Sequence, residues 1–325
     1  KNGVIVITPT GVRLESHSPD FPMFYILKYC YDPNAKYSKW QAFLDEVLPD
    51  KTMQFVLAEF IASVFISNHV LKLEKALILF GSGANGKSVV YEVLCEVLGR
   101  DNVSNYSLKA LCDDTGYYLA ETAEKLLNWA SEIAALLNNP AKFKAITSGE
   151  PVEARRPYGN AFTLYDLPKL AFNTNQLPKD PEQTPGFFRR FIIIPFEKTI
   201  PVEERNPNLA QEIINSELAG VFNWVMEGLQ RLLLQRGFTH SEAIDNMVEK
   251  YRKQSDSVAL FIGDMNLESS TTDTIALQEL YLSYRGYCKD NGLIACSNRI
   301  FSERLTNYGF KMIRRNYGRI VYATK

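Results

Sequence analysis

The chain has 325 residues, of which 46% are hydrophobic and 22% charged, and its formal net charge is −1. This composition is typical of a globular protein with room for one main core and one or two small accessory domains. The longest apolar stretches fall short of the roughly 18 residues that would span a membrane. The five cysteines lack CxxC spacing and the three histidines stand far apart, which gives no support to a zinc site or a His-based catalytic centre. Reduced thiols in a cytoplasmic protein are the favoured interpretation.

The first 70 residues are expected to form a mostly helical N-terminal subdomain. A short strand, Gly3–Ile7, is followed by a turn and a possible return strand, Val12–Leu14. The stretches Trp40–Leu48 and Met53–Ser67 show helical apolar spacing. Because the chain opens at Lys1 without a methionine, we expect it to be part of a longer protein with a domain upstream.

Residues 71–254 alternate short apolar strands with helical stretches, which predicts an α/β sheet covered by helices. A long helical segment, Leu209–Gln235, returns over this core and is expected to stop near Gly237. The predicted strands are Ala76–Phe80, Lys125–Ala130, Leu170–Asn173 and Phe191–Ile194.

Residues 255–325 predict a small C-terminal domain, with a boundary near Ser255–Ser257. Two helices, Ile275–Cys288 and Asn298–Asn307, precede two strands, Phe310–Ile313 and Arg319–Tyr322, with Gly318 in the turn between them. Helix, helix and hairpin is the order of a winged helix, a fold that binds DNA.

The C-terminal domain is strongly basic although the whole chain is nearly neutral, and this asymmetry favours contact with nucleic-acid phosphates. A basic surface that docks another protein is the alternative. The acidic residues after residue 284 are only Asp290 and Glu303, and the basic ones are Arg285, Lys289, Arg299, Arg304, Lys311, Arg314, Arg315, Arg319 and Lys325.

A glycine-rich segment between the first core strand and the helix Val89–Leu98 fits the pattern GxxxxGK[ST] completely. Glycines let backbone N–H groups turn inward to cradle phosphates, and the helix N-terminus adds partial positive charge. Lys87 would reach the β- and γ-phosphates of ATP, and Ser88 would hold Mg²⁺. A chance glycine-rich turn is the alternative. The segment is Gly81, Ser82, Gly83, Ala84, Asn85, Gly86, Lys87 and Ser88.

Polar or charged residues also stand at the ends of three other core strands. Glu132 ends the second strand, where a carboxylate polarises water and approaches Mg²⁺, although strands often end in a charged residue. Asn175 ends the third strand, where an amide orients water against the γ-phosphate, unless it belongs to a plain Asn-rich turn. Arg189 and Arg190 precede the fourth strand, where an arginine stabilises charge on a transferring phosphoryl group or forms only surface ion pairs.

In this order and spacing, the four elements resemble superfamily 3 helicases, and specifically the phage and plasmid primase-helicase group, which includes the poxvirus primase-helicase. The resemblance assigns catalytic roles to Lys87, Glu132, Asn175 and Arg190, with Arg190 as the arginine finger and Glu132 sharing the Mg²⁺ site. Many relatives carry two adjacent acids in the second motif, whereas Ser131 precedes Glu132 here. Glu132 is therefore expected to do most of the water activation.

The family also has a β-hairpin between its second and third motifs that grips DNA in a ring channel, and the matching segment here runs from Lys144 to Gly159. Lys144, Arg155 and Arg156 would contact phosphates, and Tyr158 would stack on a base or sugar. An ordinary exposed hairpin with solvated charges is the alternative. In the C-terminal domain, the expected DNA contacts are Arg299, Arg304, Arg314 and Arg315.

The resemblance implies an α/β P-loop (AAA+-like) ATPase core with a helical N-terminal subdomain and a C-terminal winged helix. It also implies ATP and Mg²⁺, a homo-hexameric ring on single-stranded and forked DNA, an upstream primase or primase-polymerase domain, and action in a host cytoplasm during phage, plasmid or mobile-element replication. Two alternatives remain. One is an ATP-dependent origin-binding or assembly switch without unwinding, and the other is a P-loop kinase of a small metabolite.

Overall fold

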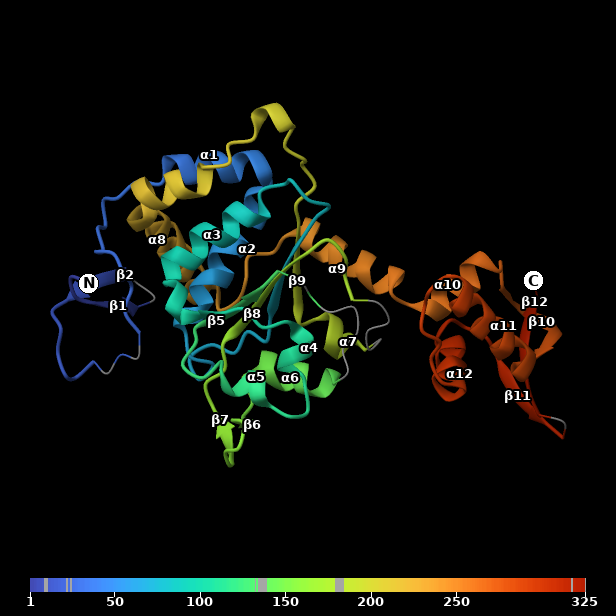
Figure 1. Ribbon diagram of the computed structural model, residues 1–325. Helices are drawn as coiled ribbons and strands as arrows, with labels where there is room; N and C mark the ends of the chain where they lie inside the picture. Colours follow the sequence, from blue (N-terminus) through green and yellow to red (C-terminus); the bar gives the residue numbers. More distant parts are fainter. Residues whose placement is uncertain are drawn as a thin grey trace. The chain divides into compact units, whose positions relative to one another are not determined.

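The computed structural model describes residues 1–8, 11–21, 23, 25–131, 133, 139–178, 184–316 and 318–324 (Figure 1). The chain divides into two compact units, one of residues 1–177 with 185–248 and the other of residues 178–184 with 249–325. This division falls inside helix α9 (Glu242–Gln254), whereas the predicted boundary lies at the end of the same helix. No helix among the described ranges is long and apolar enough to cross a membrane.

A five-stranded parallel sheet forms the centre of the first unit. Its strands are ordered β4-β5-β8-β3-β9. They are short, mostly buried apolar runs, as expected when helices cover both faces of a parallel sheet. Four of these strands were predicted, and the two-residue edge strand β4 was not. The bounds are β3 Ala76–Phe80, β4 Val103–Ser104, β5 Leu127–Ala130, β8 Lys169–Thr174 and β9 Phe191–Pro195.

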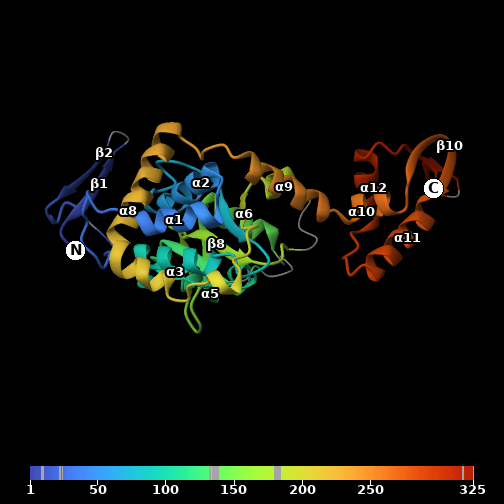
Figure 2. The ribbon, with the colours of Figure 1, turned by 90° about the horizontal axis from the view of Figure 1, so that it is seen from above.

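One face of the sheet carries the main apolar core. Alternate strand residues such as Leu77 and Ile192 pack there against α1, α2, α3 and α8, which Figure 1 shows on the same side of the sheet. Helices α1 and α8 lie side by side (Figure 2). Trp40 of α1 meets Trp224 of α8 there with ring centroids 5.4 Å apart. The bounds are α1 Ser38–Val47, α2 Lys51–Ala62, η1 Ser63–Phe65, α3 Lys87–Leu98 and α8 Leu209–Gln235.

The start of the chain forms the predicted two-stranded hairpin. Strand β1 (Val4–Thr8) pairs antiparallel with β2 (Gly11–Glu15), and the partly buried Ile5, Ile7 and Val12 pack against the same core. Residues of the first 70 therefore share one core with the sheet, and their status as a separate subdomain stays a prediction.

The other face of the sheet is covered by shorter helices, and it carries the hairpin β6–β7, which projects from the body of the unit (Figure 1). Phe143 of α6 stacks on Phe191 of β9 with ring centroids 5.1 Å apart, so this face has an aromatic core of its own. The bounds are α4 Leu108–Leu111, α5 Tyr117–Ala120, α6 Pro140–Ser148, β6 Val152–Arg155, β7 Ala161–Leu164 and α7 Pro185–Phe188, with 3-10 turns η2 Arg100–Asn102 and η3 Val202–Glu204.

The second unit has its own apolar core and a three-stranded antiparallel sheet of order β10-β12-β11. The predicted helix from Ile275 begins instead at Leu277, because Ile275 and Ala276 extend β10 and pair with Val321 and Ile320 of β12. Neither α10 nor β10 was predicted. The bounds are α10 Ser257–Asp264, β10 Glu268–Ala276, α11 Leu277–Asp290, α12 Asn298–Asn307, β11 Met312–Arg315 and β12 Gly318–Thr324.

The strand ends of the second unit also differ from the prediction. Gly318 begins β12, with φ of 131°, rather than lying within the turn, and β11 continues past Ile313 to Arg315, which pairs with Gly318. The hairpin itself is confirmed. Its arginines, Arg314, Arg315 and Arg319, therefore lie on paired strands rather than in a loop.

Candidate nucleotide-binding site

The glycine-rich segment leaves the C-terminal end of β3 and enters α3. Gly83, Ala84 and Gly86 have φ of 113°, 50° and 88°, a left-handed conformation that glycine adopts without strain. A Cβ at Gly81 would lie 2.5 Å from the carbonyl oxygen of Phe196, so the backbone there tolerates no side chain. These constraints explain the glycines of the pattern and leave a loop of backbone groups at a helix N-terminus, which suits phosphate oxygens.

Lys87 lies in the first turn of α3 and is only 7% exposed. Its Nζ donates to the carbonyl of Gly81 at 2.8 Å and to Oδ1 of Asn85 at 2.9 Å, and Asn85 Nδ2 in turn donates to the carbonyl of Phe196 at 3.0 Å. Burial lowers the pKa of Lys87. The ammonium is thus held inside the loop by neutral oxygens, which phosphate oxygens would outcompete because they carry charge.

Ser88 follows in the same turn and is exposed, as are Ser82 and Ala84. The residues present therefore fit a nucleotide phosphate. The loop offers backbone N–H donors and the Lys87 ammonium for phosphate oxygens, and the exposed Ser88 hydroxyl for a hydrated cation. Among the described residues, no group of three or more His, Cys, Asp or Glu side chains could hold a metal ion.

The C-terminal ends of β5 and β8 lie at the same end of the sheet as the glycine-rich loop. The N–H of Gly81 donates to the carbonyl of Thr174 at 3.2 Å, which joins the tip of β8 to the loop. Asn173 accepts a hydrogen bond from Trp129 Nε1 at 3.0 Å, whereas Asn175 is exposed beyond the strand. Of the two amides, Asn175 is the one presented at this end. Ser131 is exposed at the end of β5, and the predicted Glu132 lies outside the described residues.

The predicted arginines lie at the opposite, N-terminal end of the parallel strands. The N–H of Ala76 donates to the carbonyl of Arg190 at 2.7 Å, and Ala76 pairs with Phe191 at the start of the parallel strands. Five strand residues at roughly 3.3 Å each separate this end from the glycine-rich loop by about 15 Å. Neither arginine is therefore close to the glycine-rich loop of its own chain.

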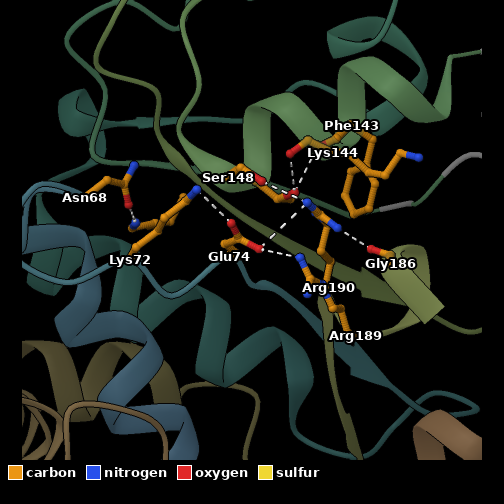
Figure 3. A network of polar contacts seen from close by, with 11 residues as sticks. Asn68, Lys72, Glu74, Phe143, Lys144, Ser148, Gly186, Arg189 and Arg190 are labelled. Carbon is orange, nitrogen blue, oxygen red and sulfur yellow. Dashed lines mark hydrogen bonds and ion pairs between the residues drawn. The ribbon is translucent and has the colours of Figure 1, made fainter.

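Arg190 is directed into the protein, where its side chain is only 9% exposed. Figure 3 shows its guanidinium between α6 and α7: Nη2 donates to Ser148 Oγ at 2.9 Å, and Nη1 donates to the carbonyl of Gly186. Nη2 also lies 3.7 Å from Oε2 of Glu74. The prediction that Arg190 is a finger for a neighbouring subunit is untested, but in this position its guanidinium is already occupied.

Arg189 has the opposite environment, because its side chain is 64% exposed. Its Nη2 lies 3.0 Å from Oε2 of Glu74, and Lys72 Nζ lies 3.0 Å from the other oxygen of that carboxylate (Figure 3). The ion pair with Lys72, together with the charges of both arginines, holds the pKa of Glu74 below its usual range. Sequence reasoning missed Glu74 and Ser148, since neither belongs to a motif.

The hairpin β6–β7 presents its tip to solvent. Tyr158 is fully exposed with φ of 59°, and the N–H of Gly159 donates to the carbonyl of Arg156 at 2.9 Å to close the turn. Arg155 and Arg156 are exposed, with Arg155 Nε donating to the carbonyl of Gly159 at 3.0 Å. Lys144 was expected on this hairpin but lies on α6, because Asn139 caps that helix and Gly149 ends it.

In the second unit, Arg299 on α12 and Arg314 and Arg315 on β11 are exposed. Arg304 is not presented in the same way, because its Nη1 lies 3.2 Å from Oδ1 of the buried Asp256. That carboxylate also accepts from the N–H groups of Val258 and Ala259, so it caps α10. Arg304 thus ties α12 to α10, a role that its place in a basic sequence did not indicate.

The fold and the loop geometry define an α/β protein with a P-loop-like core. The sequence family described as poxvirus D5 protein-like matches residues 253–320, and a family of unknown function (DUF5906) matches residues 79–190. The chain is 25% identical over 295 residues to the putative helicase L207/L206 of Acanthamoeba polyphaga mimivirus, covering 82% of this chain and 30% of that protein. It is 20% identical over 324 residues to the putative primase C962R of African swine fever virus (isolate Tick/Malawi/Lil 20-1/1983), covering 89% and 33%.

Solved structures agree at the level of the fold. The apo structure of the NrS-1 C-terminal region (305–718) superposes with a TM-score of 0.53 at 15% identity, covering 91% of this chain and 77% of that one, and an A-form apo structure of the same region gives 0.50 at 15%, covering 98% and 81%. The chain spans about a third of the length of the curated relatives that it matches. Together, the comparisons confirm the predicted resemblance to the helicase portion of the primase-helicase family.

Proposed function

We propose that this chain is the ATP-hydrolysing motor of a replicative DNA helicase, acting as a homo-hexameric ring that translocates on single-stranded DNA. The observation that carries the proposal is the placement of two elements on one sheet. A glycine-rich loop that matches the complete phosphate-binding pattern lies at the C-terminal ends of the strands, and an arginine pair lies about 15 Å away at their N-terminal ends. Such a sheet completes a hydrolytic site only when a second copy brings its arginine end to the first copy's phosphate end. The helicase and primase names of the viral relatives support this choice.

ATP is the substrate in this proposal, and Mg²⁺ bound with it would neutralise phosphate charge. The backbone of residues 81–86 cradles the phosphates, Lys87 contacts the β- and γ-phosphates, and Ser88 holds the cation. Asn175 orients the attacking water and Glu132 takes its proton, so that ADP and inorganic phosphate leave. Because Ser131 stands in the sequence where many relatives carry a second acid, Glu132 alone is proposed to activate the water.

DNA meets the motor at the hairpin tip, where Arg155 and Arg156 contact phosphates and Tyr158 stacks on a base or sugar. The exposure of all three side chains supports this role. Lys144 on α6 is a flanking phosphate contact rather than part of the tip.

The second unit is proposed to be a winged helix that binds duplex or fork DNA. Its element order of helix, strand, helix, helix and two strands, with a three-stranded antiparallel sheet, supports this assignment. Arg299 on α12 faces the groove, and Arg314 and Arg315 on the wing contact phosphates, whereas Arg304 serves its ion pair with Asp256. An upstream primase or primase-polymerase domain and a place in the host cytoplasm complete the proposal.

The test is ATP turnover and strand displacement on a forked substrate. The parent is expected to hydrolyse ATP faster with single-stranded DNA and to separate the fork. Glu132→Gln is expected to bind nucleotide but not turn it over, which makes it the control for contaminating ATPases. Nucleotide-dependent assembly on DNA without strand displacement would favour the assembly switch, and phosphotransfer to a small metabolite without DNA would favour the kinase.

A further inference from the structure

Two adjacent arginines have opposite environments, and this difference divides their roles. The side chain of Arg189 is mostly exposed and pairs with Glu74, whereas the side chain of Arg190 is nearly inaccessible. A residue that contacts a phosphate of another subunit must be presented at the surface. Arg189 meets that requirement in this structure and Arg190 does not.

Arg190 joins three segments that are distant in sequence. Its guanidinium reaches Ser148 in the last turn of α6, Gly186 in α7 and Glu74 just before β3. Within the described part of the chain, its buried Nε has no hydrogen-bond acceptor. The two terminal nitrogens of the guanidinium are therefore hydrogen-bonded but its Nε is not. A small shift of α6 would change the strength of these hydrogen bonds.

Helix α6 and the arginine segment are also joined by aromatic rings. Phe143 of α6 lies 5.5 Å from Phe187 and 5.1 Å from Phe191 between ring centroids, and these two residues flank the arginine pair. Close-packed rings transmit displacement rather than absorb it. Movement of α6 is thus expected to carry the arginine segment with it.

The same helix leads directly into the hairpin. Gly149 ends α6 in the left-handed conformation, and the N–H of Glu150 donates back to the carbonyl of Ala145 at 3.0 Å. This closure fixes the direction in which the chain leaves the helix. Strand β6 begins at Val152, so Ser148 lies within four residues of the hairpin.

We propose that the Ser148–Arg190 contact couples the DNA hairpin to the arginine that completes the neighbouring nucleotide site. Arg189 is the catalytic arginine, Arg190 and Ser148 are positioning residues, and Glu74 holds Arg189 in place. DNA that displaces the hairpin shifts α6, and α6 moves Arg189 through Arg190. The proposal rests on the proposed helicase function, because it requires DNA at the hairpin and nucleotide at the subunit interface.

The test compares Ser148→Ala with Thr147→Val in the assembled protein. Both changes remove a buried hydroxyl from adjacent positions of α6, but among the described residues the partners of Thr147 Oγ1 are the carbonyls of Phe143 and Lys144 on its own helix. Turnover is measured with and without single-stranded DNA, together with the DNA dissociation constant. Ser148→Ala is expected to keep DNA affinity, while the ratio of DNA-stimulated to DNA-free kcat falls by roughly 2- to 30-fold. Thr147→Val is expected to keep the parent ratio.

Arg190→Lys supplies a second readout, because lysine keeps the charge but lacks the planar fork that reaches three partners. It is expected to resemble Ser148→Ala, and the double variant Ser148→Ala with Arg190→Lys should lose no more than the larger single effect. Parent stimulation in Ser148→Ala, equal losses in both hydroxyl variants, or additive losses in the double variant would overturn the coupling. A parent that shows no DNA stimulation would instead overturn the proposed function on which the coupling rests.

Discussion

Replacing Arg189 by Ala should abolish ATP turnover in rings of that variant, and mixing it with Lys87→Ala subunits should restore part of the activity. The reason is geometric. Lys87 lies beyond the C-terminal end of β3, whereas the arginine pair lies at the N-terminal end of β9, and the strands run parallel. Because about 15 Å separate the two within one chain, the proposed site would take its lysine and its arginine from different subunits.

The size of the recovery follows from counting interfaces. Loss of an arginine finger costs on the order of 10³ in turnover, and loss of the phosphate-loop lysine is at least as severe. In random rings of equal proportions, about a quarter of the interfaces combine Lys87 from one chain with Arg189 from the next. Steady-state ATPase across mixing ratios should therefore peak near equal proportions, about a hundredfold or more above the sum of the separate variants.

If ATPase activity at every mixing ratio is no higher than the sum of the separate variants, the idea that Lys87 and Arg189 come from different subunits is refuted. Arg190→Ala measured in the same way decides between the two arginines. Suppose that mixing Arg190→Ala with Lys87→Ala subunits restores turnover, and that rings of Arg189→Ala alone hydrolyse ATP like the parent. Arg190 would then be the arginine that contacts the phosphate, and its role as a positioning residue would be refuted. Each variant's melting temperature serves as the control for folding, because Arg190 is buried and Arg189 is not.

Three further outcomes are expected. Lys87→Ala should retain its melting temperature and lose ATP hydrolysis, and parent-like hydrolysis would show that the phosphate site lies elsewhere. Replacing Arg314 and Arg315 by Ala should weaken duplex binding and reduce the slope of log Kd against log salt by about 0.9 per lost phosphate contact, whereas an unchanged slope would favour a protein-docking surface. Burial lowers the pKa of Lys169 to about 8, so the unfolded chain holds more protons above that pH. Stability of the parent relative to Lys169→Met should rise between about pH 8 and 10.5, by up to about 1.4 kcal/mol per pH unit, and parallel pH curves from chemical denaturation would contradict it.

The phosphate loop was predictable from the sequence because everything that defines it is local. Gly83 and Gly86 occupy turn positions with positive φ, Gly81 lies too close to the backbone of Phe196 for a side chain, and the strand and helix on either side are contiguous with the loop. The central strands were predictable for a related reason. Apolar runs such as Ala76–Phe80 and Phe191–Ile194 are too short for buried helices, and a glycine or a proline follows each of them. The edge strand β4 carried no such signal, since two residues make no pattern.

Where an apolar pattern fits two structures, only the fold decides between them. Ile275 continues the spacing of the helix that follows it, but in the folded chain it pairs with Val321, which is 46 residues away, and so belongs to β10. Similarly, the basic segment after residue 284 predicted that Arg304 would face DNA. Its partner Asp256 lies 48 residues earlier and takes up the guanidinium.

The division of roles between Arg189 and Arg190 shows the same limit at the candidate site. The sequence by itself determined that two arginines precede a buried strand, at the spacing expected for a finger. Their exposure depends on Ser148, which is 42 residues from Arg190, and on Glu74, which is 115 residues from Arg189. Side-chain direction is set by contacts between segments that meet only after the sheet and α6 have packed. The tertiary structure therefore decided which arginine is buried and which is exposed.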